Sequence, residues 1–475
     1  MTITNKEMKN GGRTQWKQWL GGITATLTMV SIGTVYGWAT TNLSRLTSSD
    51  SHIVMTTDQT SWIVSLTGIG SMIGPFLGAA AADKVGPRNT LLLTSLFFST
   101  GWLIDIFATK VAELYVARVI LGIGIGISYT TNPMYISGIA DVNIRGALGT
   151  LTAVNVFIGS LSTCIIGPFI AVRTLSIILL AVPVLFVVLF IWFPETPGYL
   201  AWKGHNEKAI RSLLFYKGMK TRQEAEEELN KVILNLEKNA NTENWPKKLR
   251  KMLLPNNRKA LGILLVLIIT QSMSGNYTTM AYLEVLFQTA DIGIDTNLAT
   301  VIVLIVGLLA AALATVTIER IGRRMLLITS TSSSFVVLGL LATYLVANAN
   351  GIDLEAVNWL PVLLLVVFQV TYQLGIGALP DALIGELFPA DVMSIGSASA
   401  TISDGILGLI ISKLYTVIGE ALGEYVTYYI FSGSCFLALI FVILFVPETM
   451  NKDFNQIQEV LADNRLQCFR KKERK

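Results

Sequence analysis

The sequence predicts an all-α membrane protein with twelve transmembrane helices in two six-helix halves. Its 475 residues have a mean hydropathy of +0.57 and only 14% charged residues. The apolar residues come in runs of about 20, the length that spans a bilayer as a helix. The tripeptide Pro-Glu-Thr closes an apolar run at 194–196 and again at 447–449. A period of about half the chain indicates a duplication, which is typical of secondary carriers.

The first half contains six apolar runs. The turn from Lys84 to Arg88 separates the second run from the third. In lipid each run must be helical, because its backbone N–H and C=O groups have no water to bind and must pair within the segment. We place these spans at 20–40, 60–82, 89–108, 112–136, 146–170 and 173–193.

A polar linker follows, and then six further runs. The linker segment 224–238 combines strong helix formers with apolar residues three and four positions apart, which predicts amphipathic helices. The turn from Arg320 to Arg324 repeats the Gly-and-Arg turn of the first half. We place the second set of spans at 260–288, 297–318, 325–347, 358–388, 394–420 and 425–446.

The chain therefore divides into five predicted segments. They are a cytoplasmic N-terminus (1–19), an N-terminal six-helix bundle (20–193), a cytoplasmic helical linker (194–259), a C-terminal six-helix bundle (260–446) and a cytoplasmic tail (447–475).

The orientation follows from Lys and Arg, which gather on one side of the twelve-span arrangement. They occupy the N-terminus, the two Gly-and-Arg turns, the linker and the tail, and are sparse in the opposite connections. Because such residues stay in the cytoplasm, we expect both termini there, and we identify no cleaved signal peptide. Asn42, the first residue of Asn-Leu-Ser, would lie in an outer connection as a glycosylation candidate.

No feature of the sequence indicates an enzyme. We find no P-loop and no nucleophile elbow, which argues against an ATP-driven pump or a hydrolase. His52 and His205 would lie on opposite sides of the membrane and cannot share a metal ion. The net charge of +4 is a topology signal, without the basic, aromatic-rich face of a nucleic-acid-binding protein. We therefore expect no cofactor, no metal and no nucleic-acid partner.

Short motifs of Gly, Pro and charged residues recur at and between the ends of the spans. The main ones are Gly33–Trp38, Asp83–Arg88, Arg145–Thr150, Pro194–Leu200, Glu319–Arg324, Gly385–Pro389 and Pro447–Thr449. Their order and spacing along nearly the whole chain resemble the sugar-porter branch of the major facilitator superfamily, and within it the insect facilitated trehalose and glucose carriers. The resemblance implies an alternating-access carrier with the fold of that superfamily.

The resemblance also implies a cytoplasmic gate of charged residues. Opposite charges at helix ends would pair when the inner ends of the two halves meet, although each exposed pair contributes only about 0–1 kcal/mol. The alternative is that these charges only enforce topology. The family's acidic residue after the fourth span is Gly138 here, and its Arg after Glu386 is Met393, so we expect a looser gate. The gate residues are Asp83, Arg88, Arg118, Arg145, Glu195, Glu319, Arg320, Arg323, Arg324, Glu386 and Glu448.

A further implication is a set of polar ligands near the middle of the membrane, because a polyol that leaves water needs its hydrogen bonds replaced. Gln271 keeps the family's first Gln of the seventh span, whereas Ala153 and Gly307 stand where other ligands are expected. Acids within a span are costly and suggest function, and the alternative for the tyrosines is helix packing. The candidate substrate residues are Gln271, Asn276, Tyr277, Tyr282, Gln373, Asp381 and Asp404.

Taken together, the motifs predict a carrier of a neutral sugar, a hexose or trehalose, that works as a monomer in the plasma membrane. Segment 34–39 of the first span lacks the acid of proton-coupled relatives, which favours facilitated diffusion. The missing ligands leave two alternatives open. One is a sugar sensor or scaffold that does not transport, and the other is a carrier of a charged non-sugar solute that uses Asp381 and Asp404.

Overall fold

The computed structural model describes residues 15–48, 53–219, 221–240, 250–290, 292, 294–380, 383, 387–388, 393–450, 456–457 and 459. Within this part of the chain every regular element is a helix. Twelve helical segments there are long and apolar enough to cross a membrane. The predicted all-α fold with twelve spans is therefore confirmed.

The first half follows the predicted runs closely. The chain passes from α1 to α2 through Thr26, whose backbone stays in the right-handed helical region, so the two helices form one span. The elements are α1 (Trp16–Ala25), α2 (Leu27–Thr47), α3 (Thr57–Val85), α4 (Pro87–Phe107), α5 (Val111–Ile139), α6 (Val142–Ile166), η1 (Gly167–Phe169) and α7 (Val172–Phe190).

Glycines bring α3 and α5 into close contact. A Cβ atom at Gly70 would lie 2.2 Å from the carbonyl oxygen of Val119, and one at Gly74 would lie 2.5 Å from that of Ile123. No side chain fits at these distances, so the two backbones pack directly against each other. Such small-residue contacts replace the hydrophobic effect, which does not drive helices together in lipid.

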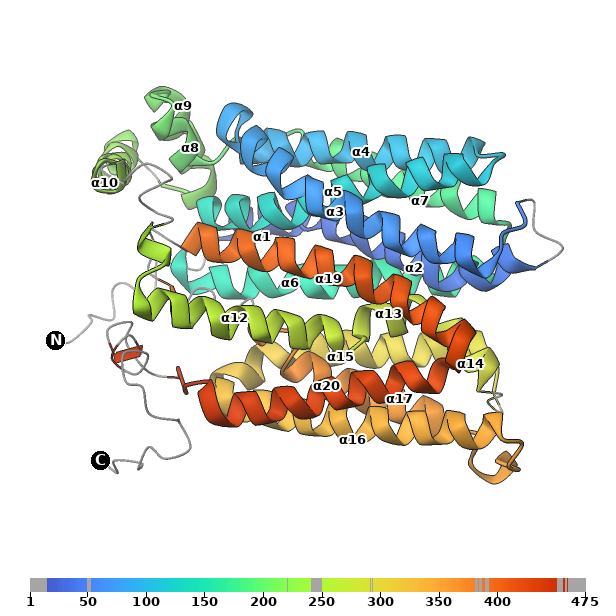
Figure 1. Ribbon diagram of the computed structural model, residues 1–475. Helices are drawn as coiled ribbons and strands as arrows, with labels where there is room; N and C mark the ends of the chain where they lie inside the picture. Colours follow the sequence, from blue (N-terminus) through green and yellow to red (C-terminus); the bar gives the residue numbers. More distant parts are fainter. Residues whose placement is uncertain are drawn as a thin grey trace.

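Three short helices of the linker lie at one end of the bundle (Figure 1), which we call the linker end; the opposite end is the far end. They are α8 (Pro197–Trp202), α9 (Asn206–Lys217) and α10 (Arg222–Ala240). Lys217 of α9 pairs with Glu228 of α10 at 2.7 Å and with Asp141, before α6, at 3.9 Å. These ion pairs join the described linker helices to the first half.

The second half differs from the prediction in two spans. The predicted span at 260–288 is interrupted at Ser274 and Gly275, and helix α17 of the predicted span at 358–388 ends at Leu374. The elements are α12 (Pro255–Met273), α13 (Asn276–Ala281), α14 (Leu283–Thr289), α15 (Thr296–Ile321), α16 (Arg323–Ala349), η2 (Glu355–Val357), α17 (Leu360–Leu374), α19 (Met393–Leu422) and α20 (Glu424–Phe445).

The first of these breaks depends on a glycine. Gly275 has a φ of +71°, in the left-handed region, and a Cβ atom there would lie 2.1 Å from Cε2 of Phe431 on α20. Any other residue would strain the backbone and collide with that ring. The break is thus fixed by the backbone conformation and by packing together.

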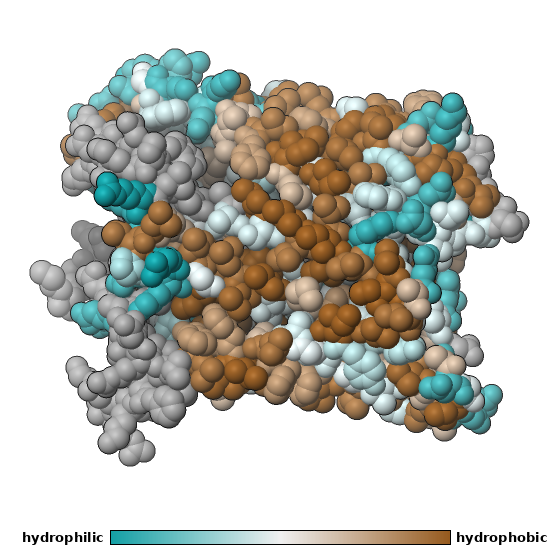
Figure 2. All heavy atoms as spheres, in the orientation of Figure 1, coloured by the Kyte–Doolittle hydropathy of each residue, from teal (hydrophilic) through white to brown (hydrophobic). Residues whose placement is uncertain are grey.

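The two halves lie side by side, and α19 packs on α3 while α15 packs on α6. In Figure 1 the first half is above the second, which runs from yellow to red. Figure 2 shows apolar residues over the middle of this face and hydrophilic residues toward both ends. Large apolar side chains such as Phe169 and Leu437 are exposed. This pattern fits a surface that faces lipid.

Candidate functional site

Polar side chains from three helices of the second half converge where its spans are interrupted. Gln271 of α12 donates from Nε2 to the carbonyl oxygen of Gly377 at 3.1 Å. Gln373 lies beside the same turn, since a Cβ atom at Gly377 would lie 3.1 Å from its Oε1. Ser272 donates to Oδ1 of Asp404 on α19 at 2.9 Å. We call Gln271, Ser272, Gln373 and Asp404 the central polar cluster.

The central polar cluster is open to solvent on one side. Asp404 is exposed although α19 packs against helices of both halves. Gln271 and Gln373 are each only half-buried. The cluster therefore offers carboxamide, hydroxyl and carboxylate groups to a small polar molecule, with both donors and acceptors available.

The tyrosines and Asn276 occupy different environments. Tyr277 of α13 meets Tyr36 of α2 edge to face, with ring centroids 5.6 Å apart, and so lies at the junction of the two halves. Tyr282 is buried and packs on Tyr415 within the second half, with centroids 5.0 Å apart. Asn276 begins α13 and is half-buried. Of the predicted substrate residues, Asp381 lies outside the described residues.

The charged motifs form two equivalent clamps at the linker end. The Glu195 carboxylate accepts the main-chain N–H of Arg88 at 3.1 Å and of Asn89 at 3.4 Å, at the start of α4. Glu448 accepts those of Arg323 at 3.0 Å and Arg324 at 3.2 Å, at the start of α16. Each carboxylate thus satisfies helix N-terminal donors and opposes the helix dipole.

Each clamp is confined to its own half. The guanidinium of Arg88 donates to the carbonyl oxygen of Ile191, and that of Arg324 to Ile443 at 2.7 Å. Burial raises the pKa of Glu195, and its hydrogen bonds from the main chain oppose that shift. Asp83 and Arg320 are exposed nearby in the sequence. The side chains of Arg145 and Glu319, and all of Glu386, lie outside the described residues.

Arg118 does not lie with the other predicted gate residues. It is buried near the start of α5, where its Nη2 lies 2.9 Å from Oδ1 of Asp105 on α4. Ser176 of α7 donates to the other oxygen of Asp105, and the Trp38 ring of α2 lies 3.7 Å from the guanidinium carbon. The structure therefore corrects the expected position of Arg118, because a buried cation needs a buried anion beside it.

Sequence reasoning overlooked Asp105 as the partner of Arg118. A lone acid near the end of an apolar span was a usable signal, because acids in membrane spans are rarely left unpaired. The pair joins four helices of the first half through Trp38, Asp105, Arg118 and Ser176.

At the far end, polar contacts join the two halves. Lys413 of α19 binds Asp58 of α3 at 2.5 Å and Ser61 at 2.9 Å. Ser44 of α2 donates to Glu284 of α14 at 2.9 Å. We call these four side chains together with Glu284 the far-end contacts. They hold the two halves against each other at the end opposite the linker.

The predicted glycosylation site is also corrected. Asn42 lies within α2 rather than in a connection, is fully buried, and donates from Nδ2 to the carbonyl oxygen of Trp38 at 3.0 Å. A glycan acceptor must lie on an accessible loop. The sequence motif alone could not show that α2 continues to Thr47.

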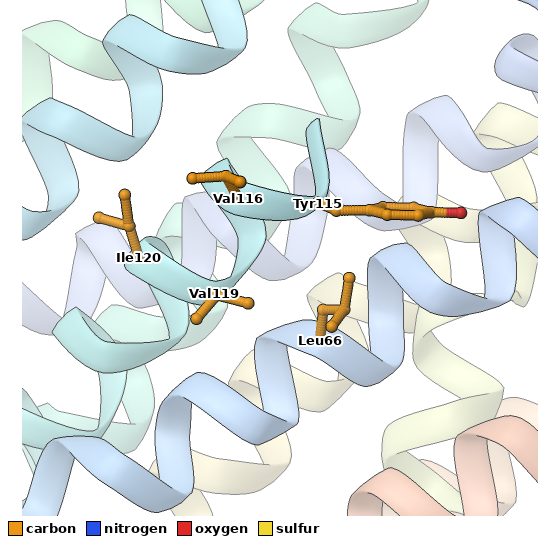
Figure 3. A pocket seen from close by; sticks show the side chains of 5 residues that line it. All are labelled: Leu66, Tyr115, Val116, Val119 and Ile120. Carbon is orange, nitrogen blue, oxygen red and sulfur yellow. The ribbon is translucent and has the colours of Figure 1, made fainter. Parts of the chain in front are cut away.

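A second hollow lies between α3 and α5 and is unsuited to a sugar. Figure 3 shows its lining, which consists of Leu66, Tyr115, Val116, Val119 and Ile120. The hydroxyl of Tyr115 already donates to the carbonyl oxygen of Gln59 at 3.2 Å. An apolar hollow of this kind cannot replace the hydrogen bonds of a polyol.

Comparison with known proteins places these observations in context. Residues 16–461 match the family model described as "Sugar (and other) transporter". Facilitated trehalose transporters Tret1 are similar to the chain: that of Drosophila pseudoobscura pseudoobscura is 29% identical over 93% of this chain and 51% of its own length. That of Anopheles gambiae is 30% identical over 93% and 56%, and that of Culex quinquefasciatus 30% over 86% and 78%. The chain spans about half the length of the first two relatives.

Two solved structures share the architecture. One is the major facilitator superfamily proton:xylose symporter XylE bound to 6-bromo-6-deoxy-D-glucose, with a TM-score of 0.75, 20% identity, and coverage of 94% of this chain and 99% of that one. The other is the inward-open xylose transporter XylE from E. coli, with a TM-score of 0.76, 20% identity, and coverage of 92% and 98%. At this identity the likeness shows the fold, which is that of the major facilitator superfamily.

Proposed function

Because this chain belongs to the sugar transporter family, we propose that it carries a neutral sugar, a hexose or trehalose, across the membrane by alternating access. We further propose that it works as a monomer in the plasma membrane. The observation that supports the proposal best is the central polar cluster, which lies where two spans of one half are interrupted. Interrupted helices expose backbone and polar groups to a substrate within the membrane, as many carriers require.

The proposal includes an orientation and a gate. The linker end is the cytoplasmic end, because the Lys and Arg residues gather there. The segments 1–19, 194–259 and 447–475 then lie in the cytoplasm, and 20–193 and 260–446 are the two bundles. The gate comprises the charged residues named above at the linker end, where the arginine side chains and the exposed Asp83 are available to the opposite half. The far-end contacts would serve as its counterpart outside.

We propose that transport is facilitated diffusion, since residues 34–39 of the first span contain no acid. The decisive experiment measures uptake of radiolabelled glucose and trehalose into proteoliposomes that contain the purified protein. Uptake should saturate, stop at equal internal and external concentrations, and be unaffected by a protonophore. Accumulation above the external concentration that collapses with a protonophore would contradict facilitated diffusion and direct attention to Asp404 and Asp105.

A matched control uses the central polar cluster. Gln271→Ala should raise the half-saturating sugar concentration about tenfold, because a lost hydrogen bond to substrate is worth about 1–1.5 kcal/mol. Its surface expression should stay near that of the parent protein. Binding without uptake in the parent protein would instead favour the sensor, and uptake of a charged solute would favour the third alternative.

A further inference from the structure

Gln369 is a carboxamide in an unusual position. It lies on α17, is fully buried, and neither its Nε2 nor its Oε1 has a hydrogen-bond partner among the described residues. Leaving such a group unpaired costs about 1–3 kcal/mol, whereas a leucine of similar volume would pack without that cost. A partner in another arrangement of the protein would remove the cost.

The surroundings of Gln369 belong to both halves. A Cβ atom at Gly307 of α15 would lie 3.0 Å from Nε2 of Gln369 and 2.7 Å from Cε1 of Phe157. Phe157 is on α6, in the first half, and α6 packs on α15 across the junction of the halves. The amide therefore fills the space left by the missing side chain at Gly307, next to a ring that the first half supplies. Rocking of the halves would change this contact.

Gln369 also continues the central polar cluster. It lies four residues before Gln373, so the two amides are on the same face of α17 and about 6 Å apart along the helix axis. Gln373 in turn lies beside Gly377, whose carbonyl oxygen binds Gln271. The three carboxamides thus form a row that runs from the open side of the cluster to the junction between α15 and α6.

We propose that Gln369 is a further substrate-binding and specificity-determining residue, which binds a sugar hydroxyl once Phe157 moves away from Gly307. The inference rests on the proposed function, because it assigns Gln369 to the same substrate. A carboxamide both donates and accepts, so it discriminates a hydroxyl from a hydrogen at one position of the sugar. In the arrangement described here the amide is covered, and alternation of the two halves uncovers it.

The test compares Gln369→Leu with the parent protein in detergent and in proteoliposomes. Glucose- or trehalose-induced thermal stabilisation reports binding independently of transport. We expect Gln369→Leu to melt at or above the temperature of the sugar-free parent protein, because an unpaired buried amide is lost. We also expect the sugar concentration for half-maximal stabilisation and for half-maximal uptake to rise about tenfold.

A panel of 2-deoxy-, 3-deoxy- and 6-deoxyglucose provides the readout that a purely structural role would not change. The parent protein should bind one of these analogues more weakly than glucose, and Gln369→Leu should lose that difference for the same hydroxyl only. Gln369→Met, which is unbranched like glutamine, guards against a folding defect of the leucine variant. Leu365→Met, one turn earlier and also buried, is the matched control and should keep the parent's values.

Unchanged half-saturation and unchanged discrimination in both Gln369 variants would overturn the inference while the parent still carries sugar. If neither sugar stabilises the parent protein nor enters the vesicles, the proposed function fails, and the assignment of Gln369 fails with it.

Discussion

The two halves repeat the same clamp but differ in how their helices cross the membrane. In the first half, α3 to α5 are uninterrupted, glycines pack their backbones together, and the buried pair of Arg118 and Asp105 joins helices from inside. In the second half, two spans are interrupted near Gly275 and Gly375, and the central polar cluster lies at these interruptions.

The difference indicates that duplication left two copies of one frame and then separated their tasks. A half whose polar interior is an internally paired ion pair resists deformation, because moving either charge leaves the other uncompensated. A half with helix breaks and half-buried amides presents groups that a ligand can bind. The first half is thus the rigid partner, against which the second half presents its site.

The largest expected effect comes from breaking the buried pair. Asp105→Ala leaves Arg118 buried without an anion and should lower stability by about 3–5 kcal/mol, with most of the protein lost during expression. Adding Arg118→Met to Asp105→Ala should recover a large part of that loss. Thermal melting of the detergent-solubilised protein measures both. If the double variant is no more stable than Asp105→Ala, the pair does not account for the rigidity of the first half.

A comparable intervention in the second half should affect transport as well as stability. Gly275→Ala forces a side chain into a left-handed backbone and against Phe431, at a cost of about 2–4 kcal/mol. We expect partly retained expression and a loss of sugar uptake of more than about tenfold, because the break also positions Gln271 and Asn276. Phe431→Leu in the same background should restore part of the stability. Parent-like uptake by Gly275→Ala would show that the break is dispensable.

The contact of the halves at the far end can be changed without touching either interior. Asp58→Lys should weaken the far-end contacts by about 0.2–1 kcal/mol, and exchanging the charges with Lys413→Asp should restore them. Accessibility of a cysteine placed at the far end reports the change as a shift of up to about fivefold in the population of the opened form. Identical labelling of the single variant, the exchanged pair and the parent would exclude a role for this ion pair.

The smallest effect concerns the linker, and it tests whether the linker moves with the first half. The hydrogen bond from Lys217 lowers the pKa of Glu228, with smaller contributions from the Lys217 and Lys231 charges. Because the folded pKa is the lower one, the contact contributes fully above the ordinary glutamate range and is lost as pH falls through the lowered pKa. The contribution should be below about 1 kcal/mol.

Hydrogen exchange in α9 and α10 measures this effect between neutral and acidic pH. Protection should fall with pH in the parent protein and be low and less pH-dependent in Glu228→Gln. The contact of Lys217 with Asp141 should keep α9 on the first half in both. Protection that is independent of pH in the parent protein would contradict the assignment.

The number and order of the spans could be predicted from sequence, because runs of apolar residues of membrane length leave one arrangement open. The break at Gly275 could not be placed, since Ser-Gly within an apolar run is also compatible with a continuous helix. Gln271 was identified from its resemblance to the family, whereas Gln369 lies in an apolar run with no motif around it. Lys413 and Asp58 are 355 residues apart, and only the packing of α19 on α3 brings them together.

The two glutamate clamps also constrain the order in which the protein can be made. The first clamp needs Arg88 and Glu195 only, 107 residues apart, so it can close once the sixth span has left the ribosome and before residue 260 is synthesised. The second clamp needs Glu448, which follows the last span. Each half can therefore lock its own first Gly-and-Arg turn to its own end. During biogenesis a finished first half can then await the second as a template, without borrowing a residue from it.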